Sequence, residues 1–463
     1  MTHATEMKSV GSADADNADV SGQLEQTFRQ LAQRVFDLAQ SDEAMSLSFM
    51  AEQSQFTRFN QAKVRQTGSV HDGELTLTLM AGDRTTFYEL PMTGNLDADW
   101  VTVKSALDGL RADIQHLPDD PYQVPPSGNA MSHDVHHGEL LAPDEIIEAI
   151  LPVVSGLDFA GLYAGGVSIR AYADSIGQRH WFCTDSFTLD YSLFTEDGKA
   201  VKGTFAGDRW DQSAYTARLN ESKRQLKQLT IPAKSIPKGR YRTYLAPAAL
   251  AELVSMFSWG AVSEAALQRG GSALGLLRSE EKLLSNQFNL TENFEHGLVP
   301  RFNNLGEVAP TRLPLIENGK LVNTLISSRT AKEYGKTANG ASQWEGLRSP
   351  DVQPGTLRRD DILSTLDTGL YLSNLHYLNW SDRPNGRITG MTRYACFWVE
   401  NGSIVAPIEN LRFDESLYQF FGENLIALTD IQEFVPEVGS YGNRELGGMW
   451  LPGALVEGFT YTL

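Results

Sequence analysis

Residues 303–340 read NNLGEVAPTRLPLIENGKLVNTLISSRTAKEYGKTANG. Two short apolar segments, Leu313–Ile316 and Leu321–Ile326, are joined by the pair Asn318-Gly319. Asn-Gly is the preferred pair for a type I′ hairpin turn, because both central residues of that turn need a positive φ. The stretch therefore predicts a β-hairpin, followed by a short polar helix.

The first third of the chain indicates a mixed unit that resembles an α/β sandwich. Apolar residues recur at helical spacing from Leu24 to Leu38 and again between Asp97 and Leu117. Between the two helices, three segments are typical of strands, and Asp72-Gly73 is expected to form the turn before the last of them. These segments are 45–50, 56–59 and 75–79.

The rest of the chain divides at proline-rich and glycine-rich breaks. The middle region is expected to be strand-rich α+β, and the last region mainly antiparallel β, so the fold class is α+β. The expected parts are a disordered tail (1–22), an N-terminal domain (23–117), a proline-rich linker (118–140), a central domain (141–236) and a C-terminal domain (237–463).

Composition excludes several classes of protein. The formal net charge of −19 disfavours a nucleic-acid surface, which needs clustered Lys and Arg. Two cysteines, Cys183 and Cys396, cannot form a disulfide framework, and both are expected to be buried. No apolar run reaches the ~18 residues of a membrane span, and the N-terminus does not resemble a secretory signal. We therefore expect a cytoplasmic protein.

Several segments together resemble the TldD/PmbA (TldE) peptidase family, also called modulators of DNA gyrase. The order of these segments along the chain, rather than any one of them, carries the resemblance. They are Glu52, Ser54 and Arg58 near the N-terminus, the turn 174–177 with Asp174 in place of an Asn, the strip 303–340, Gly369-Leu370-Tyr371, 386–402 and the closing glycine-rich turn. The resemblance implies a three-part chain that pairs with another family member around a chamber where extended peptides are cut.

In TldD-like members, the resemblance implies a helical HExxxH motif and a later cysteine that together bind zinc. Counting back from the strip, the corresponding helix is expected within 245–267, which contains no histidine. The glycine-rich turn at the far end contains no cysteine. Hydroxyl and apolar groups do not replace imidazole and thiolate as zinc ligands. We therefore expect no catalytic residue and no metal ligand in this chain, and a degenerate site around Ser255, Gly260 and Ser440.

Two histidine-containing segments offer other chemistry. His133, His136 and His137 would share one face of a helix, where they could bind a metal, but the neighbouring Gly138 favours a solvated loop. His296 follows Glu295 in a polar segment and is expected to be a surface residue rather than a base.

The favoured hypothesis is a PmbA/TldE-like subunit of a TldD/TldE-type metallopeptidase that degrades or processes unfolded peptides. Zinc would come from a TldD-like partner, in a heterodimer or a higher oligomer, so this chain would hold no cofactor and would be inactive alone. The alternative is a homodimeric peptide-binding or scaffold protein with no proteolytic role. An autonomous hydrolase is a third possibility, for which no nucleophile–base pair stands out. Neither the peptide substrate nor the residues that bind it follow from the sequence.

Overall fold

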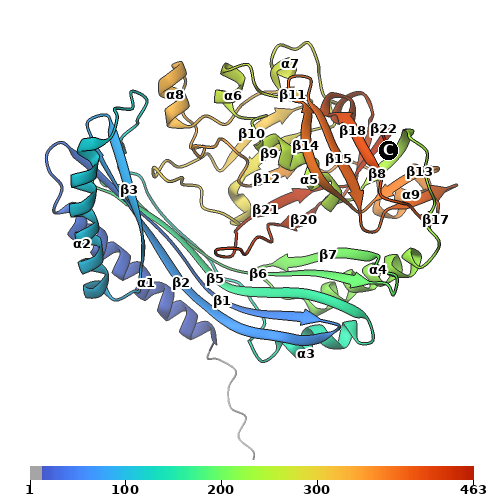
Figure 1. Ribbon diagram of the computed structural model, residues 1–463, viewed down its shortest axis with the longest axis horizontal. Helices are drawn as coiled ribbons and strands as arrows, with labels where there is room; N and C mark the ends of the chain where they lie inside the picture. The colour runs from blue at the N-terminus through green and yellow to red at the C-terminus, as the bar shows by residue number, and fades with distance from the viewer. Residues whose placement is uncertain (1–12) are drawn as a thin grey trace, which may run out of the picture.

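The computed structural model describes residues 13–463, and the first half of this range builds one long, curved sheet (Figure 1). Within the described residues the sheet has seven strands, in the order β3-β2-β1-β5-β6-β4, and β7 pairs with the second half of β6. Neighbours are antiparallel except β4, which runs parallel to β6. The strands are β1 (Glu43–Asn60), β2 (Lys63–Ala81), β3 (Arg84–Pro91), β4 (Met131–His136), β5 (Asp158–Asp174), β6 (Arg179–Phe194) and β7 (Ala200–Gly207).

Helices cover one face of this sheet in two groups. Helices α1 (Ala13–Phe36) and α2 (Leu96–Asp113) pack on β1, β2 and β5, and α2 begins at Asn95, whose side chain accepts two backbone N–H bonds. The second group packs on the other end of β5 and β6. It contains α3 (Ile146–Ile150), η2 (Leu151–Val154) and α4 (Gln212–Leu229), and η1 (Ile114–His116) extends α2.

The structure corrects two expectations about the N-terminal region. Helix α1 begins at Ala13, so part of the tail expected at 1–22 is helical, and residues 1–12 lie outside the described range. Asp72-Gly73 is not a turn, because β2 runs through it and pairs Gly73 with Ala51. The turn lies instead at Gln61-Ala62, where both residues have φ of 51°. Long-range pairing thus outweighs the local preference of Asp-Gly.

The proline-rich segment 118–140 also contains β4, and so contributes a strand to the sheet. Strand β1 pairs with β5 from Ser46 opposite Asp174 to Phe59 opposite Gly161. The expected N-terminal and central domains therefore share one continuous sheet. The domain boundary placed between them by composition remains a prediction.

The second half of the chain builds two further sheets, and most of their strand pairs are antiparallel, which confirms the predicted class. Within the described residues, a six-stranded sheet has the order β11-β10-β9-β12-β21-β20. Its strands are β9 (Leu290–Asn293), β10 (Arg312–Glu317), β11 (Lys320–Leu321), β12 (Pro350–Val352), β20 (Glu433–Pro436) and β21 (Gly448–Leu451).

A nine-stranded sheet, again counted within the described range, has the order β14-β15-β18-β22-β8-β13-β16-β17, and β19 pairs with β22. Its strands are β8 (Gly239–Leu245), β13 (Gly369–Leu372), β14 (Asn374–Asp382), β15 (Arg387–Arg393), β16 (Phe397–Glu400), β17 (Ser403–Pro407), β18 (Arg412–Ser416), β19 (Leu425–Leu428) and β22 (Ala454–Tyr461). The short helical segments of this half are α6 (Glu264–Gln268), α7 (Gly275–Arg278), α8 (Ser328–Tyr334), α9 (Ile362–Leu366), η4 (Phe294–His296), η5 (Arg359–Asp361) and the π-helical η6 (Gln419–Glu423).

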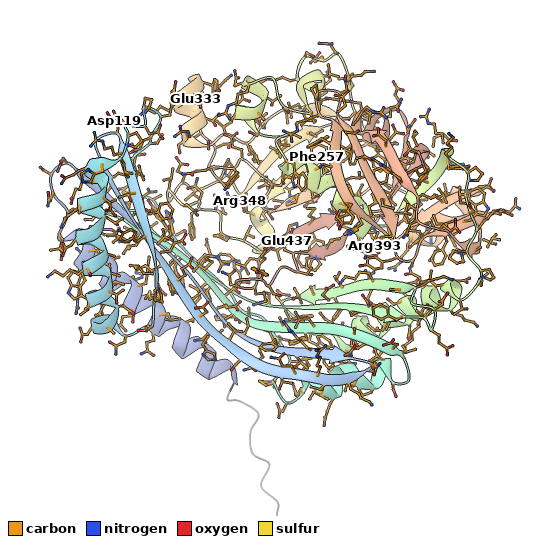
Figure 2. All side chains as sticks on the ribbon, viewed as in Figure 1. Asp119, Phe257, Glu333, Arg348, Arg393 and Glu437 are labelled. Carbon is orange, nitrogen blue, oxygen red and sulfur yellow. The ribbon has the colours of Figure 1, made fainter. Side chains whose placement is uncertain are left out.

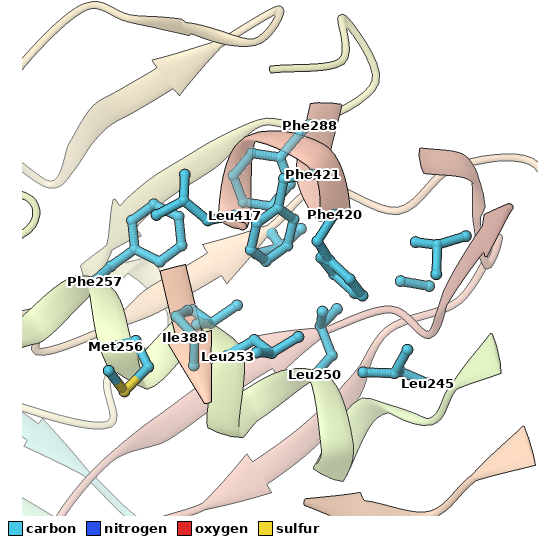
Figure 3. Close-up of a cluster of buried hydrophobic side chains, with 14 of the residues drawn as sticks. Leu245, Leu250, Leu253, Met256, Phe257, Phe288, Ile388, Leu417, Phe420 and Phe421 are labelled. Atoms are coloured by element: carbon cyan, nitrogen blue, oxygen red, sulfur yellow. The ribbon is translucent and has the colours of Figure 1, made fainter. Parts of the chain in front are cut away.

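Helix α5 (Pro247–Ser255) and the following turn η3 (Met256–Ser258) lie in the main apolar core of this half (Figure 3). Leu250 and Phe257 are fully buried, and Phe257 packs against Phe288 and Phe421 with ring centroids 6.1 and 5.7 Å apart. A helix that is apolar on nearly all sides needs such an environment. Among the described residues, no helix is long and apolar enough to cross a membrane.

The strip 303–340 forms the predicted hairpin. Strands β10 and β11 flank Asn318-Gly319, whose φ values of 47° and 73° fit the type I′ turn. A Cβ on Gly319 would also lie 2.2 Å from the carbonyl oxygen of Leu284, so a larger residue is excluded there. Helix α8 follows, with Ser327 as its N-cap and Gly335 at its C-terminus in the left-handed conformation.

The strip is attached to the long sheet through Gln178. The Gln178 amide donates to the backbone carbonyl of Leu305 at 3.1 Å and to the carboxylate of Asp174 at 2.8 Å. Asp174 is fully buried, and its other carboxylate oxygen accepts the backbone N–H groups of Ile176, Gly177 and Gln178. The Asp therefore holds the turn at the position where the family resemblance implied an Asn.

Glu264 joins the strip to α7, and its ionisation should make the protein sensitive to acid. The carboxylate accepts bonds from Arg278 at 2.9 and 3.1 Å, from Gln268 and from Thr324. Burial alone would raise the pKa of Glu264, but these bonds outweigh it and lower the pKa to about 2.

Because this pKa is lower in the folded state, Glu264 contributes stability above the unfolded pKa near 4.5, and that stability is lost as the pH falls toward 2. The wild-type protein should lose part of its unfolding free energy when the pH falls from 5 to 3. In Glu264→Gln this loss should be smaller by about 2 kcal/mol. Urea unfolding at both pH values measures this difference. Glu423→Gln, at an exposed glutamate, is the matched control and should keep the wild-type difference. Equal pH profiles for Glu264→Gln and the wild type would contradict this role.

Candidate functional site

A cleft of about 560 Å³ lies between the long sheet and the C-terminal half. Arg170 of β5 lines one wall. The other wall belongs to the C-terminal half, and Figure 2 shows Arg348 and Glu437 on its side that faces the long strands. Its lining residues come from the end of α5 and η3, the start of the strip, the segment 342–350, the loop 437–447 and β21. The cleft is thus assembled from segments far apart in sequence.

The residues named for a degenerate metal site lie at this cleft or near residues that line it. Ser255 lines it, as do Ser258 and Trp259, the residues just before Gly260. Ser440 lies in the loop 437–447, which contributes Glu437 and Glu445 to the lining. Folding therefore brings the two sequence regions named for the site to one place.

The helix expected within 245–267 occupies the first half of that range. Helix α5 ends at Ser255, η3 continues it to Ser258, and a separate helix, α6, begins at Glu264. Gly260 has a φ of 81°, which interrupts any continuous helix. The break turns Trp259 outward, with 51 % of its surface exposed.

The side chains at this place do not fit zinc. The Ser255 hydroxyl donates to the carbonyl of Glu252 at 2.8 Å, and the Ser258 hydroxyl accepts the backbone N–H of Leu347 at 3.0 Å. Neutral hydroxyls of this kind are poor zinc ligands compared with imidazole and thiolate. Among residues 13–463, no group of three or more His, Cys, Asp or Glu side chains is arranged to hold a metal ion.

Sequence patterns do not single out three carboxylates that influence one another here: Glu437 and Glu445 line the cleft, and Glu252 lies on α5, whose last residue lines it. Burial raises the pKa of Glu252, and the charge of Glu437 raises it further. The pKa of Glu437 is raised in the same way, by burial and by the charge of Glu445. None of the three side chains forms a hydrogen bond or an ion pair within the described part of the chain. Glu252 precedes Glu437 by 185 residues in the sequence, so no local motif could have revealed the group.

The loop 437–447 is held on the long sheet by Arg444, whose side chain is buried. Its guanidinium donates to the Ser186 carbonyl and hydroxyl, the Gly166 carbonyl and the Ser168 hydroxyl, at 2.8–3.1 Å. Its backbone N–H donates to the buried carboxylate of Glu52 at 2.8 Å. Glu52, which contributed to the family resemblance, thus helps to hold in place the loop that lines the cleft.

Arg348 organises the opposite wall. Its guanidinium donates to four backbone carbonyls and lies 4.8 Å from the centre of the Phe294 ring. Its backbone N–H donates to the fully buried Glu292, whose pKa is raised by burial and lowered in part by the charge of Arg348. The carbonyls belong to Pro300, Arg301 and Phe302, just before the strip, and to Gly340, its last residue.

The histidine cluster lies elsewhere and is not a loop. Residues 131–136 form strand β4, so consecutive side chains point to opposite faces. His133 contacts Glu25 at 3.1 Å, and His137 contacts Asp185 at 3.6 Å. The loop interpretation was wrong because pairing with β6 is a long-range interaction, invisible in the local Pro and Gly pattern. No metal-binding group involving these histidines occurs within the described residues.

The two cysteines are buried, as expected, and His296 lies near the surface. Cys183 and Cys396 are both buried and free, and burial raises the pKa of both thiols. His296 stays partly exposed, 3.1 Å from Asp351, and its ring stacks on Trp450 with centroids 5.1 Å apart. It does not line the cleft.

Comparison with known proteins agrees with this architecture. Residues 238–462 match the family model described as the PmbA/TldA metallopeptidase C-terminal domain. Residues 238–462 therefore belong to the TldD/PmbA (TldE) family. No curated protein sequence matches the chain.

Three solved structures share the fold of this chain over nearly its whole length. TldE from Thermococcus kodakarensis is 14 % identical to this chain in sequence, and the structural match has a TM-score of 0.77. The match covers 94 % of this chain and 100 % of the TldE chain. A protein described as a modulator of DNA gyrase from Thermotoga maritima is 16 % identical, with a TM-score of 0.74 over 94 % and 100 % of the two chains. Another so described, from Bacteroides thetaiotaomicron, is 17 % identical, with a TM-score of 0.74 over 94 % and 98 %. The likeness includes the long sheet that precedes residue 238.

Proposed function

We propose that this protein is the non-metal-binding, PmbA/TldE-like subunit of a TldD/TldE-type metallopeptidase that processes unfolded peptides. One observation carries the proposal. At the cleft where the resemblance places the zinc helix, the chain presents Ser255 and Ser258, whose hydroxyls are engaged with its own backbone. The likeness in fold to a TldE supports the same branch.

A TldD-like partner would supply the zinc in this proposal. Zinc bound by protein side chains lowers the pKa of a bound water to about 7, which provides the nucleophile for peptide hydrolysis. The present chain would contribute walls and peptide contacts to the shared chamber. Its own cleft has no group that replaces the metal, so it would have no peptidase activity alone.

The decisive experiment is co-purification with a family member that contains HExxxH, followed by a cleavage assay on unstructured peptides. Cleavage is expected with both chains present and should vanish when the partner's metal-binding histidines are replaced by alanine. The chain alone, assayed with added zinc, should leave the peptides intact. Cleavage by the chain alone would contradict the proposal. A stable homodimer that neither binds such a partner nor supports cleavage would favour the scaffold alternative.

A further inference from the structure

Arg170 is a cation in the cleft that has almost no partner in its own chain. Its Nη1 donates to the carbonyl of the preceding residue, Ile169, at 2.8 Å. Within residues 13–463 this is the one hydrogen bond of the side chain, and no carboxylate forms an ion pair with it. A guanidinium has five N–H donors, so most of those of Arg170 are free to bind a ligand.

The surroundings make this free cation unusual. Burial lowers the pKa of Arg170, and the charge of Glu52 opposes that effect. The Glu52 carboxylate is already bonded to the backbone N–H of Arg444. Removing a cation from water without a hydrogen-bonded counter-charge is costly, so an anion that reached Arg170 would be stabilised there.

Arg348 provides the contrast within the same cleft. Both arginines are half-buried, but four backbone carbonyls and the Phe294 ring occupy the guanidinium of Arg348. Arg348 therefore builds the wall, whereas Arg170 remains available to a ligand. These two are the arginines that line the cleft in the described part of the chain.

Other residues at the cleft indicate a peptide rather than a small or a polymeric anion. Trp259 lines the cleft, and the highly exposed Trp344 and Tyr441 lie on two segments that line it. Exposed aromatic side chains around a cleft are typical of binding sites for organic ligands. Glu437 and Glu445 on the wall opposite Arg170 can accept N–H bonds, and with a net charge of −19 they disfavour a polyanion.

We propose that Arg170 binds a carboxylate of a peptide that enters the cleft. The carboxylate would accept two parallel N–H bonds from the guanidinium, the arrangement that planar Arg and carboxylate groups favour. The peptide's backbone N–H groups would face Glu437 and Glu445. This inference rests on the proposed peptide-handling function and gives the non-metal subunit a part in choosing the substrate.

The test is calorimetric titration of the full chain with three peptides. They are N-acetyl-Phe-Ala-Ala-Ala with a free C-terminal carboxylate, the same peptide as its C-terminal amide, and N-acetyl-Phe-Glu-Ala-Ala amide. We expect the free acid to bind at least tenfold more tightly than its amide. The third peptide identifies the source of the carboxylate: affinity equal to that of the free acid indicates a side chain, and affinity equal to that of the amide indicates the C-terminus.

Arg170→Gln should bring all three peptides to the same weak affinity, whereas Arg170→Lys should keep part of the preference for the carboxylate. Arg358→Gln, at an exposed arginine outside the cleft, should behave as the wild type. Circular dichroism confirms that each variant is folded. Equal binding of the three peptides by the wild type, no binding of any, or an unchanged preference in Arg170→Gln would overturn the inference. Because no partner is present, these results are separate from the cleavage assay.

Discussion

Replacing Arg348 by methionine should lower the free energy of unfolding by about 4 kcal/mol, because several hydrogen bonds from a charged donor are lost and a buried carboxylate loses a nearby positive charge. The substitution leaves four backbone carbonyls, just before the strip and at its last residue, without their donor. It also removes the positive charge that partly compensates the buried Glu292. Urea-induced unfolding, followed by circular dichroism, measures the loss.

Arg358→Met is the matched control for Arg348→Met. The Arg358 side chain is 71 % exposed and lies 4.0 Å from Asp361, so its replacement should change stability by less than about 0.5 kcal/mol. Similar losses in both variants would show that the four carbonyl contacts of Arg348 contribute nothing specific.

Arg444→Met should have the second largest effect, a loss of about 3 kcal/mol together with a local release of the loop 437–447. Arg444 connects this loop to β5 and β6 through four hydrogen bonds from its guanidinium. Hydrogen exchange should therefore become faster in the loop and at Gly166–Arg170, while the exchange of α5 in the core remains slow.

Arg209→Met provides the comparison for Arg444→Met, because the Arg209 side chain is 68 % exposed and pairs with an equally exposed Glu139. It should leave both stability and exchange at wild-type values. If Arg444→Met lowers stability without accelerating exchange in the loop, Arg444 does not act as the tether between the two halves.

Sequence patterns predicted the features that depend on neighbouring residues. The Asn318-Gly319 turn is where it was expected, and Asn401, which precedes Gly402 between β16 and β17, has the positive φ of the same turn type. Such turns are set by the conformations open to two residues. The α+β class followed in the same way from the spacing of apolar residues.

Features set by distant pairing were missed. Asp72-Gly73 has good turn chemistry, yet β1 pairs with β2 across it, and β3 pairs with β2 from Glu74 onward. The histidine segment looked like a loop, but it finds a partner in β6, about 48 residues further along the chain. Local propensity cannot anticipate a strand whose hydrogen bonds come from so far away.

At the candidate site, too, the types of residue could be read from the sequence, whereas contacts made by folding could not. The lack of histidine at 245–267 could be seen in the sequence, since it concerns which residues are present. The free guanidinium of Arg170 could not, because Arg170 and Arg348 look alike in sequence. What distinguishes them is the number of carbonyls that the fold places around each guanidinium.

The pairing of β1 with β5 limits how the chain can be divided into fragments. A truncation after residue 117 would leave one edge of β1 without its partner, and a fragment starting at residue 141 would expose the matching edge of β5. Unpaired edges of this length, 14 residues on each strand, promote aggregation. Expression trials should therefore keep residues 13–236 together. Residues 238–462 can be removed without breaking any strand pair of the long sheet.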